Sequence, residues 1–458
     1  MKKLSKLIII LLSIYLIIEL KQLNILPNKY IVPLTIIIVI LNTLIIKTKK
    51  LLNIISYIIL IPLIIIGLKY TLETKKFLKT GFNNNIEINS YNVLVLKENN
   101  KTIEEINKTG YLKTEQEKTY LDNLNIKGKQ EYKNIYELYE DLINKKIESI
   151  TLHESYINLL EEEYNDLLDK TKIIYSFNIK NETEKQKETN KLEPINIYIS
   201  GSDSRSGIIE ENTRTDVNMI MTINPKTKTI LLTSIPRDYY VKLHNTTGLK
   251  DKLTHSGIYG IEMSKKTLED LFEIKIDYVI KVGFNSVINI VDTIGGIDIE
   301  SDKTFITHCG DGGAEKTYIK EGLNHLTGPQ ALSYARERYA YYEGDNHRIQ
   351  NQQQVLEAII TKSIKDKKII LKYNEYLENF KNLYRTDMPE SLIKLYIKEQ
   401  LNKNTTWKIE KQVVKGYGAS SETYSMPGRK LYVMNPDIES VKQATKNINN
   451  IINLSDWL

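Results

Sequence analysis

Three long apolar runs at the start of the chain restrict most strongly what it can fold into. They cover residues 7–20, 30–46 and 51–68. A helix that crosses a bilayer needs about 20 residues, with a lower limit of about 17, so the second and third runs are long enough. The first run is shorter and contains Glu19, and no small-residue cleavage site of a signal peptide follows it. We predict a membrane anchor of three transmembrane helices within residues 1–70.

Lysines beside these runs predict the orientation of the anchor. One cluster precedes the first run, and Lys47, Lys49 and Lys50 separate the second run from the third. Because cytoplasmic loops are enriched in lysine and arginine, both clusters are expected on the cytoplasmic side. Three crossings then place everything after Leu68 outside the cytoplasm. The chain is therefore predicted to be a multi-pass protein of the cell membrane, with its catalytic domain outside the cytoplasm. The alternative, buried helices of a soluble protein, is disfavoured by three such runs so close together.

Composition excludes several classes of protein. With 458 residues, the chain is too long for a single domain. Its net charge of +6 is too small to indicate a nucleic-acid partner. The single cysteine, Cys309, excludes an intrachain disulfide bond and a cysteine-based zinc site. Oxygen ligands for a hard cation are therefore the metal chemistry that the chain offers most readily.

Residues 71–190 are predicted to form a small α/β accessory domain that ends in a linker. Strand patterns at residues 91–96 and 147–152 alternate with helical patterns. His153, at the start of the second helical pattern, is interpreted as part of a solvated helix face because nothing pairs with it at ligand spacing. Residues 180–191 contain no apolar side chain, which is typical of a linker.

An arginine-rich segment, residues 336–354, is the strongest candidate for a binding site. Arg336 and Arg338 are two residues apart, so an extended backbone would direct both to one side. Asp345 follows a glycine and is predicted to be a helix N-cap, which places Arg348 in the first helical turn. An arginine there opposes the helix dipole unless an anion is bound beside it. The segment predicts one wall of a phosphate or pyrophosphate site, and the alternative is a solvated loop with surface ion pairs.

Two aspartates lie at the ends of predicted strands. Asp203 follows a strand predicted at residues 195–201, and Asp216 precedes one at residues 217–223. Loops beyond strand ends are exposed, while the strand holds their base rigid. A magnesium ion is commonly bound through one or two carboxylates plus substrate phosphates. We predict that Asp203 and Asp216 hold Mg²⁺ (or Mn²⁺), and the alternative is a pair of turn or N-cap aspartates.

Further arginines extend the predicted phosphate site. Arg214 lies two residues before Asp216, and Arg237 follows Pro236, which ends a strand predicted at residues 229–233. A guanidinium fork binds two phosphate oxygens at once, which a lysine ammonium does not do. Lysine dominates this chain, yet arginine recurs in each of these segments. Composition alone would have placed lysine there.

These motifs occur in one order between residues 195 and 365, and together they resemble the LytR–CpsA–Psr family of Gram-positive cell-wall enzymes. The motifs include Asp203, Arg214-Thr215-Asp216, Ser234-Ile235-Pro236-Arg237-Asp238, residues 284–297 and 322–332, Arg336-Glu337-Arg338, Gly344-Asp345-Asn346-His347-Arg348 and Gln352-Gln353.

The resemblance implies a fold, an activity and a site. The fold is α/β, with an α/β/α sandwich around a central mixed sheet in a catalytic domain of residues 191–458. The activity is that of a phosphotransferase, which moves a glycopolymer (capsular polysaccharide or teichoic acid) from a polyprenyl pyrophosphate onto peptidoglycan at the membrane lipid surface. Magnesium lies at the positions matching Asp203 and Asp216. The residues implied to bind the phosphates are Arg214, Arg237, Arg336, Arg338, Arg348 and Gln352, with Arg237, Arg336, Arg338 and Arg348 acting in catalysis.

The residues leave two alternatives for the function. A polyprenyl-pyrophosphate phosphatase would use the same arginines with water as the acceptor. A non-catalytic envelope regulator would bind the lipid-linked polymer without turnover, and it would have less use for the two aspartates. The general base also stays open, because Asp203, Asp216 and Asp238 are all conceivable.

Overall fold

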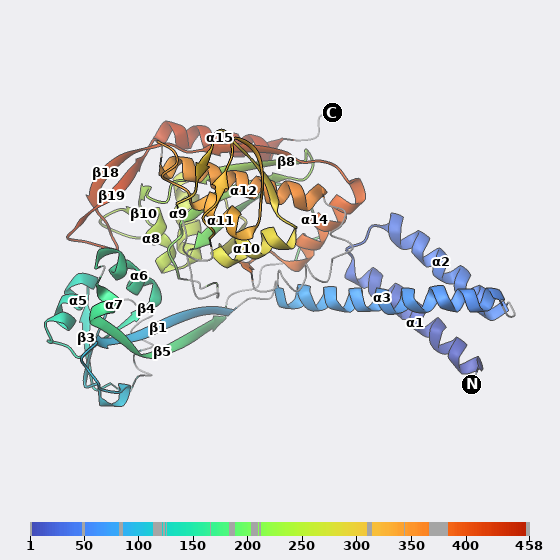
Figure 1. The fold of residues 1–458 in the computed structure, drawn as a ribbon, viewed down its shortest axis with the longest axis horizontal. Helices are drawn as coiled ribbons and strands as arrows, with labels where there is room; N and C mark the ends of the chain where they lie inside the picture. The colour runs from blue at the N-terminus through green and yellow to red at the C-terminus, as the bar shows by residue number, and fades with distance from the viewer. Residues whose placement is uncertain are drawn as a thin grey trace.

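The computed structural model describes residues 2–47, 51–81, 86–112, 121, 124, 126–164, 166–182, 188–202, 209, 212–308, 314–342, 344–365 and 383–454. Helices at the N-terminus extend away from two sheet-containing regions (Figure 1). The first of these regions follows the helices, and the second contains the rest of the chain.

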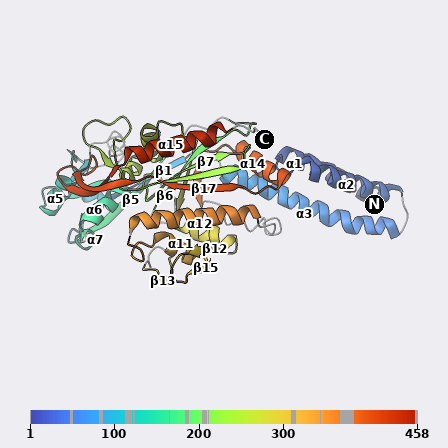
Figure 2. The same cartoon turned by 90° about the horizontal axis from the view of Figure 1, so that it is seen from above.

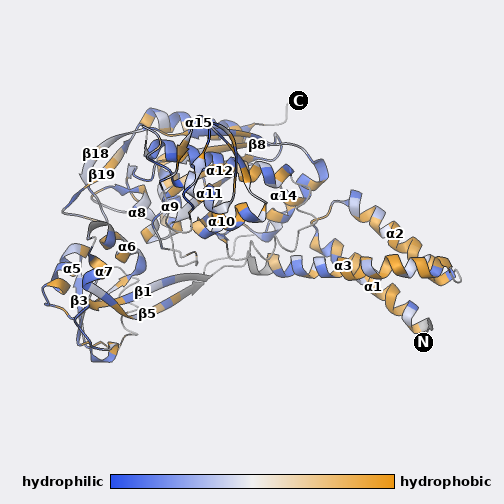
Figure 3. Ribbon diagram, viewed as in Figure 1, coloured by the Kyte–Doolittle hydropathy of each residue, from blue (hydrophilic) through white to orange (hydrophobic). Residues whose placement is uncertain are grey.

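Three helices form the N-terminal region: α1 (Lys2–Leu23), α2 (Asn28–Lys47) and α3 (Leu51–Gly81). They pack through a small apolar cluster that includes Leu16, Ile38 and Leu60. Most of their other large apolar side chains are exposed, and Ile58 keeps 66% of its surface. Apolar residues cover the three helices along much of their length (Figure 3). Exposed apolar surface on this scale indicates a lipid environment or a partner surface.

The prediction of three membrane-spanning helices is corrected to two candidate spans. In the part of the chain that the structure describes, only α2 and residues Leu51–Leu78 of α3 are long and apolar enough to cross a membrane. The first apolar run does form a helix, α1, but charged residues lie at both of its ends, including Lys3, Lys6, Glu19 and Lys21, so its uncharged part is too short. The carboxylate of Glu19 forms an ion pair with Lys75 of α3.

The next region contains a five-stranded sheet in the order β3-β2-β4-β1-β5. Helices α5 (Ile135–Ile143) and α6 (Glu154–Glu163) pack on it through a core that includes Leu138, Leu152 and Leu160. His153 is buried, contrary to the interpretation as a solvated face, and its ring accepts a hydrogen bond from the backbone N–H of Ser155 at the start of α6. The strands are β1 (Ile86–Leu96), β2 (Lys108–Leu112), β3 (Gly128–Tyr132), β4 (Ser149–His153) and β5 (Thr171–Glu182), with η1 (Ile103–Glu105) and α7 (Leu167–Lys170) between them.

The larger region is built around a six-stranded mixed sheet in the order β16-β11-β6-β7-β8-β17. The β11–β6 and β8–β17 pairs are parallel, and the other neighbours are antiparallel. The three strands expected from the sequence form its centre, so the prediction of a mixed α/β fold is confirmed. The strands are β6 (Ile195–Ser202), β7 (Val217–Asn224), β8 (Thr229–Ile235), β11 (Tyr278–Gly283), β16 (Tyr384–Thr386) and β17 (Lys408–Val413).

Helices cover both faces of this sheet because its central strands are apolar on both sides. Alternate residues separate the two cores: Tyr198 packs with α9 (Ile261–Phe272) and α15 (Ile438–Asn453) on one face. Ile197 packs with α12 (Asp345–Lys365) and α14 (Glu390–Lys403) on the other face. The helices α15 and α12 lie on opposite sides of the strands (Figure 2).

A further layer packs on the outer side of α12. It contains α10 (Phe284–Thr293), β12 (Ile297–Ser301), β13 (Phe305–Ile306), β14 (Tyr318–Ile319), β15 (Gly322–Leu326) and α11 (Gly328–Arg336). The prediction of extended backbone at Arg336 is wrong, because Arg336 is the last residue of α11. This helix starts with a capping box formed by Thr327 and Gln330. The remaining elements are β9 (Tyr240–Val241), β10 (Asp251–Lys252), α8 (Leu253–Ser256), η2 (Gly257–Tyr259), β18 (Gly416–Glu422) and β19 (Lys430–Pro436).

Candidate functional site

Three strand ends of the six-stranded sheet meet at one edge and bring distant segments together. The end of β6 pairs with the start of β7 through Gly201 and Val217. The start of β7 pairs with the end of β8 through Asn218 and Ile235. The segments just beyond these ends, which carry Asp216 and Arg237, are therefore neighbours although they are 21 residues apart in the chain.

The loop that carries Arg214 and Asp216 is held by buried hydrogen bonds. Thr215 lies between them, and its hydroxyl is 3.0 Å from the hydroxyl of Tyr198 on β6. The side-chain amide of Asn218 donates to the Thr215 carbonyl at 2.9 Å. Because Thr215 is almost completely buried, these bonds fix the backbone and so the directions of the charged side chains on either side of it.

An ion pair between Arg237 and Asp216 lies at the centre of the site. Arg237 Nη1 donates to Asp216 Oδ1 at 2.7 Å. Burial raises the pKa of Asp216, but Arg237, Arg214 and Arg348 outweigh this effect and bring the pKa to about 2. Asp216 is therefore a carboxylate throughout the physiological pH range. Three arginines therefore stabilise the charge of one acidic group, and Arg237 contacts it directly.

Arg348 reaches this cluster from the start of α12. Its side chain is only 6% exposed, and its Nη2 lies 2.9 Å from Asp345 Oδ1. The sequence predicted Asp345 as an N-cap, but α12 includes Asp345, and the carbonyl of Gly344 accepts the backbone N–H of Arg348. The Asp345 carboxylate binds the arginines instead, because Nε of Arg338 also lies 3.5 Å from it.

Buried guanidinium groups in this cluster retain unused hydrogen-bonding capacity. Among the described residues, Nε of Arg237 and Nε of Arg348 are buried without a hydrogen-bond partner, and Nε of Arg237 lies 3.7 Å from Asp238 Oδ2 in an ion pair. Burial lowers the pKa of Arg348; Asp345 opposes that shift, whereas Arg237 and Arg338 add to it. Burial also lowers the pKa of Arg214. A bound anion would accept these N–H groups and relieve the repulsion between the cations, which is the arrangement of a phosphate site.

The other predicted site residues are less closely grouped. The guanidinium of Arg336 stacks on the ring of Phe284, with its central carbon 4.4 Å from the ring centroid. Gln352 is half-buried on α12, one turn after Arg348. Asp203 lies outside the described residues, so the predicted pairing of Asp203 with Asp216 is not described. Within the described ranges, no group of three or more His, Cys, Asp or Glu side chains is arranged to hold a metal ion.

A match to a protein-family model shows which family this chain belongs to. The model of the LytR_cpsA_psr family matches residues 155–449. The chain belongs to the LytR–CpsA–Psr family. This confirms the resemblance seen in the sequence motifs. The matched range includes the whole six-stranded sheet and every described residue of the arginine cluster.

Relatives within the LytR–CpsA–Psr family carry names that state an activity. A Bacillus mycoides (strain KBAB4) protein named polyisoprenyl-teichoic acid–peptidoglycan teichoic acid transferase TagU is 36% identical over 173 residues, 38% of this chain and 53% of that protein. The Bacillus subtilis (strain 168) protein of the same name is 34% identical over 206 residues, 45% of this chain and 63% of that protein. The chain thus spans about half to two thirds of the relatives it matches. The crystal structure of B. subtilis TagV covers 58% of this chain and 100% of its own, at 26% identity and a TM-score of 0.49.

Sequence reasoning missed Glu337, which lies between Arg336 and Arg338. This carboxylate is 1% exposed and accepts backbone N–H groups from His308 at 2.6 Å, Tyr339 at 2.6 Å and Ala340 at 2.9 Å. Burial raises the pKa of Glu337, but the backbone hydrogen bonds outweigh it and keep the pKa below its ordinary value. In the sequence a glutamate between two arginines suggests only a surface ion pair, and its buried backbone partners are visible only in the fold. Glu337 is a positioning residue that fixes the turn between Arg336 and Arg338.

We predict that Glu337→Gln weakens binding of a prenyl pyrophosphate by about tenfold, because an amide cannot accept all the N–H groups that the carboxylate accepts. The measurement is the dissociation constant by titration, together with the melting temperature. Glu315→Gln, which changes an exposed carboxylate in the same layer, is the matched control and should bind normally. A lowered melting temperature with unchanged lipid binding would show that Glu337 serves stability alone.

Proposed function

We propose that this LytR–CpsA–Psr protein is a membrane-anchored transferase that moves a glycopolymer from a polyprenyl pyrophosphate onto peptidoglycan. One observation carries the proposal: Arg237 donates to Asp216, whose pKa is also lowered by the positive charges of Arg214 and Arg348 from two other segments. Nε of Arg237 and Nε of Arg348 are buried without a hydrogen-bond partner among the described residues. The names of the TagU relatives support teichoic acid as the polymer.

The chemistry of phosphoryl transfer suits this set of residues. A pyrophosphate diester carries two negative charges, and catalysis of its transfer consists mostly of positioning and charge stabilisation. In the proposed reaction, an acceptor hydroxyl attacks the phosphorus that carries the polymer. The bond from that phosphorus to the bridging oxygen breaks, polyprenyl phosphate leaves, and the proton of the hydroxyl passes to a base or to the leaving phosphate. Planar guanidinium forks can bind oxygens of both phosphates while this charge moves.

Asp216 is a suitable ligand for the predicted magnesium ion. It is ionised, and its Oδ1 is engaged by Arg237 while Oδ2 makes no hydrogen bond or ion pair with a described residue. Magnesium is commonly held by one or two carboxylates plus substrate phosphates, so Asp216, with Asp203 and the lipid, would be sufficient. A bound Mg²⁺ (or Mn²⁺) would neutralise charge on the pyrophosphate.

We propose that residues 1–70 anchor the protein, residues 71–190 form an accessory domain and residues 191–458 form the catalytic domain, outside the cytoplasm. The two candidate spans, α2 and α3, form a hairpin that supports this orientation. The orientation does not require α1 to cross the membrane. Lys47 ends α2, and Lys49 and Lys50 precede α3 in the sequence, which favours the cytoplasmic side for this end of the hairpin. Both other ends of the hairpin, and the chain after α3, would then lie outside.

Reconstitution tests the transferase against its two alternatives. The full-length chain in lipid nanodiscs would be supplied with polyprenyl-pyrophosphate-linked polymer, magnesium and peptidoglycan. If the protein is a transferase, polymer becomes covalently bound to peptidoglycan and polyprenyl phosphate is released. Release of polymer phosphate to water, with or without peptidoglycan, would identify a phosphatase. Binding of the lipid-linked polymer without any product would identify a regulator.

A further inference from the structure

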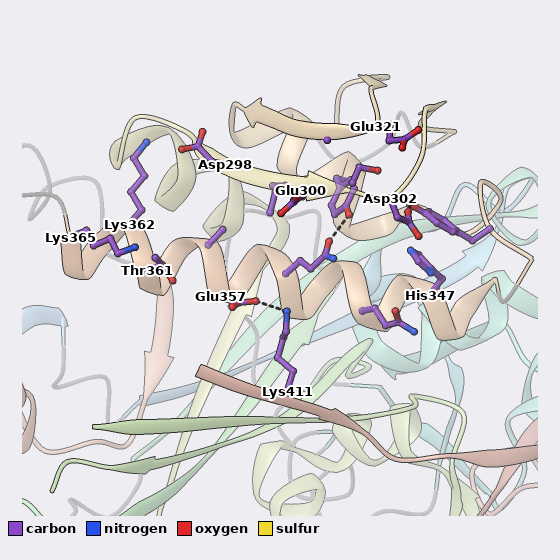
Figure 4. A pocket seen from close by; sticks show the side chains of 18 residues that line it. Asp298, Glu300, Asp302, Glu321, His347, Glu357, Thr361, Lys362, Lys365 and Lys411 are labelled. Carbon is purple, nitrogen blue, oxygen red and sulfur yellow. Dashed lines mark hydrogen bonds and ion pairs between the residues drawn. The ribbon is translucent and has the colours of Figure 1, made fainter. Parts of the chain in front are cut away.

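A long groove runs along α12 on the side that faces the outer layer (Figure 4). Its volume is about 1110 Å³. The floor is formed by α12, including His347, Gln350 and Thr361, and one wall is formed by β12 and the turn before β15. In Figure 4, Asp298, Glu300 and Asp302 extend from that wall, above the helix, and Lys411 approaches from the opposite side.

The groove begins beside the arginine cluster. His347 lines it, and the next residue, Arg348, points into the cluster. The lining side chains on α12 recur at helical spacing as far as Lys365. At a rise of about 1.5 Å per residue, this stretch of helix is roughly 27 Å long. A chain attached to a group at the arginine cluster could therefore extend along several consecutive units within the groove.

Polar side chains recur along the lining, and Ile299, Tyr334 and Ala358 add apolar surface between them. Carboxylates, amides, a hydroxyl and lysines are mixed along its length, and several are already paired. Glu357 lies 2.5 Å from Lys411, and the Tyr334 hydroxyl donates to Gln354 at 2.5 Å. The side chains of Glu300 and Glu321 make no hydrogen bond or ion pair with another described residue, and both are exposed. They are therefore available as acceptors for external hydroxyl groups.

We propose that this groove binds a neutral, hydroxyl-rich glycan strand, and this inference rests on the proposed transferase function. Carboxylates accept hydrogen bonds from sugar hydroxyl groups, and amides both accept and donate them, in defined directions. Lys362, Lys365 and Lys411 also line the groove, so carboxylates and ammonium groups are mixed along it. The carboxylates disfavour a polymer that carries a phosphate on every unit, because they repel its charges. The position beside the arginine cluster places one end of such a strand where the pyrophosphate reacts.

Thr361→Trp tests the groove because it places a bulky ring on its floor. Lys446→Trp, at an exposed position on α15, is the matched control. The double change Glu300→Gln and Glu321→Gln keeps the shape of the groove and removes two charges, so it gives an independent result if the tryptophan variant does not fold. Direct binding of N-acetylchitotetraose to the full-length chain is measured by titration calorimetry. The wild type and Lys446→Trp should bind it, and both groove variants should bind about tenfold more weakly.

Transfer kinetics then distinguish the two sources of such a glycan. A raised KM for the peptidoglycan acceptor, with kcat and the donor KM unchanged, assigns the groove to the acceptor strand. A raised KM for the lipid-linked donor alone assigns it to saccharide units of the donor. Failure of the wild type to transfer would refute the proposed function, while the chitotetraose measurement would still test the groove. The groove proposal is overturned if the wild type does not bind the oligosaccharide, if Thr361→Trp binds it normally, or if polyglycerol phosphate binds in its place.

Discussion

Replacing Arg348 by alanine is expected to lower the rate of polymer transfer by about 10²–10³-fold, the usual loss when one preorganised donor to a developing charge is removed. Arg348 is the most buried guanidinium with a described ion pair in the site, and its Nε has no hydrogen-bond partner among the described residues. The loss should occur in kcat and in lipid affinity together, because the guanidinium would contact the phosphate in both states. The measurement is transfer of radiolabelled polymer by the reconstituted full-length variant.

Arg348→Lys is the matched variant for this experiment. It keeps a positive charge at the start of α12 but removes the planar fork, so we expect an activity between those of the wild type and the alanine variant. Circular dichroism and the melting temperature check that both variants fold. Transfer at the wild-type rate by Arg348→Ala would contradict the assignment of the site.

Asp216→Asn should reduce turnover by about 100-fold while prenyl pyrophosphate binding without metal stays equal or becomes tighter. The substitution removes a negative charge from the midst of Arg214, Arg237 and Arg348, so an anion is held at least as well. Turnover falls because the carboxylate proposed to hold magnesium is lost. The measurements are transfer rates across a magnesium titration, with EDTA as the metal-free limit, and lipid binding in EDTA.

Asp270→Asn provides the control, because Asp270 is an exposed carboxylate that forms an ion pair with His244. It should leave the magnesium dependence unchanged. If Asp216→Asn kept the wild-type magnesium dependence, Asp216 would not be a metal ligand. If it lost lipid binding and turnover equally, Asp216 would serve only to orient Arg237.

The contact between Asp216 and Arg237 could be predicted in outline from the sequence. Short, largely apolar runs identified the strands that became β6, β7 and β8, and the short turn between β7 and β8 favours neighbouring antiparallel strands. Residues just beyond those strand ends then share one edge of the sheet. The convergence of Arg348 on the same edge required the family motif order, because spacing alone does not say where α12 packs.

Other features could not be predicted, because they depend on interactions that the spacing of residues in the sequence does not reveal. Arg336 was expected on extended backbone, but the capping box at Thr327 extended α11 as far as Arg336. The first apolar run forms α1 but carries too many charged residues to qualify as a span. The ion pair of its Glu19 with Lys75 of α3 could not be predicted from spacing. Glu337 is important through backbone N–H groups of a distant loop and of its own turn, which no side-chain pattern reveals.

The central claim is that the arginine cluster binds a pyrophosphate head group. A crystal structure of the protein with geranylgeranyl pyrophosphate and magnesium tests it most directly. We predict phosphate oxygens within hydrogen-bond distance of Arg237 and Arg348, with their Nε groups among the donors. Phosphates bound elsewhere, with the Arg237 and Arg348 side chains making no contact to them, would contradict the account.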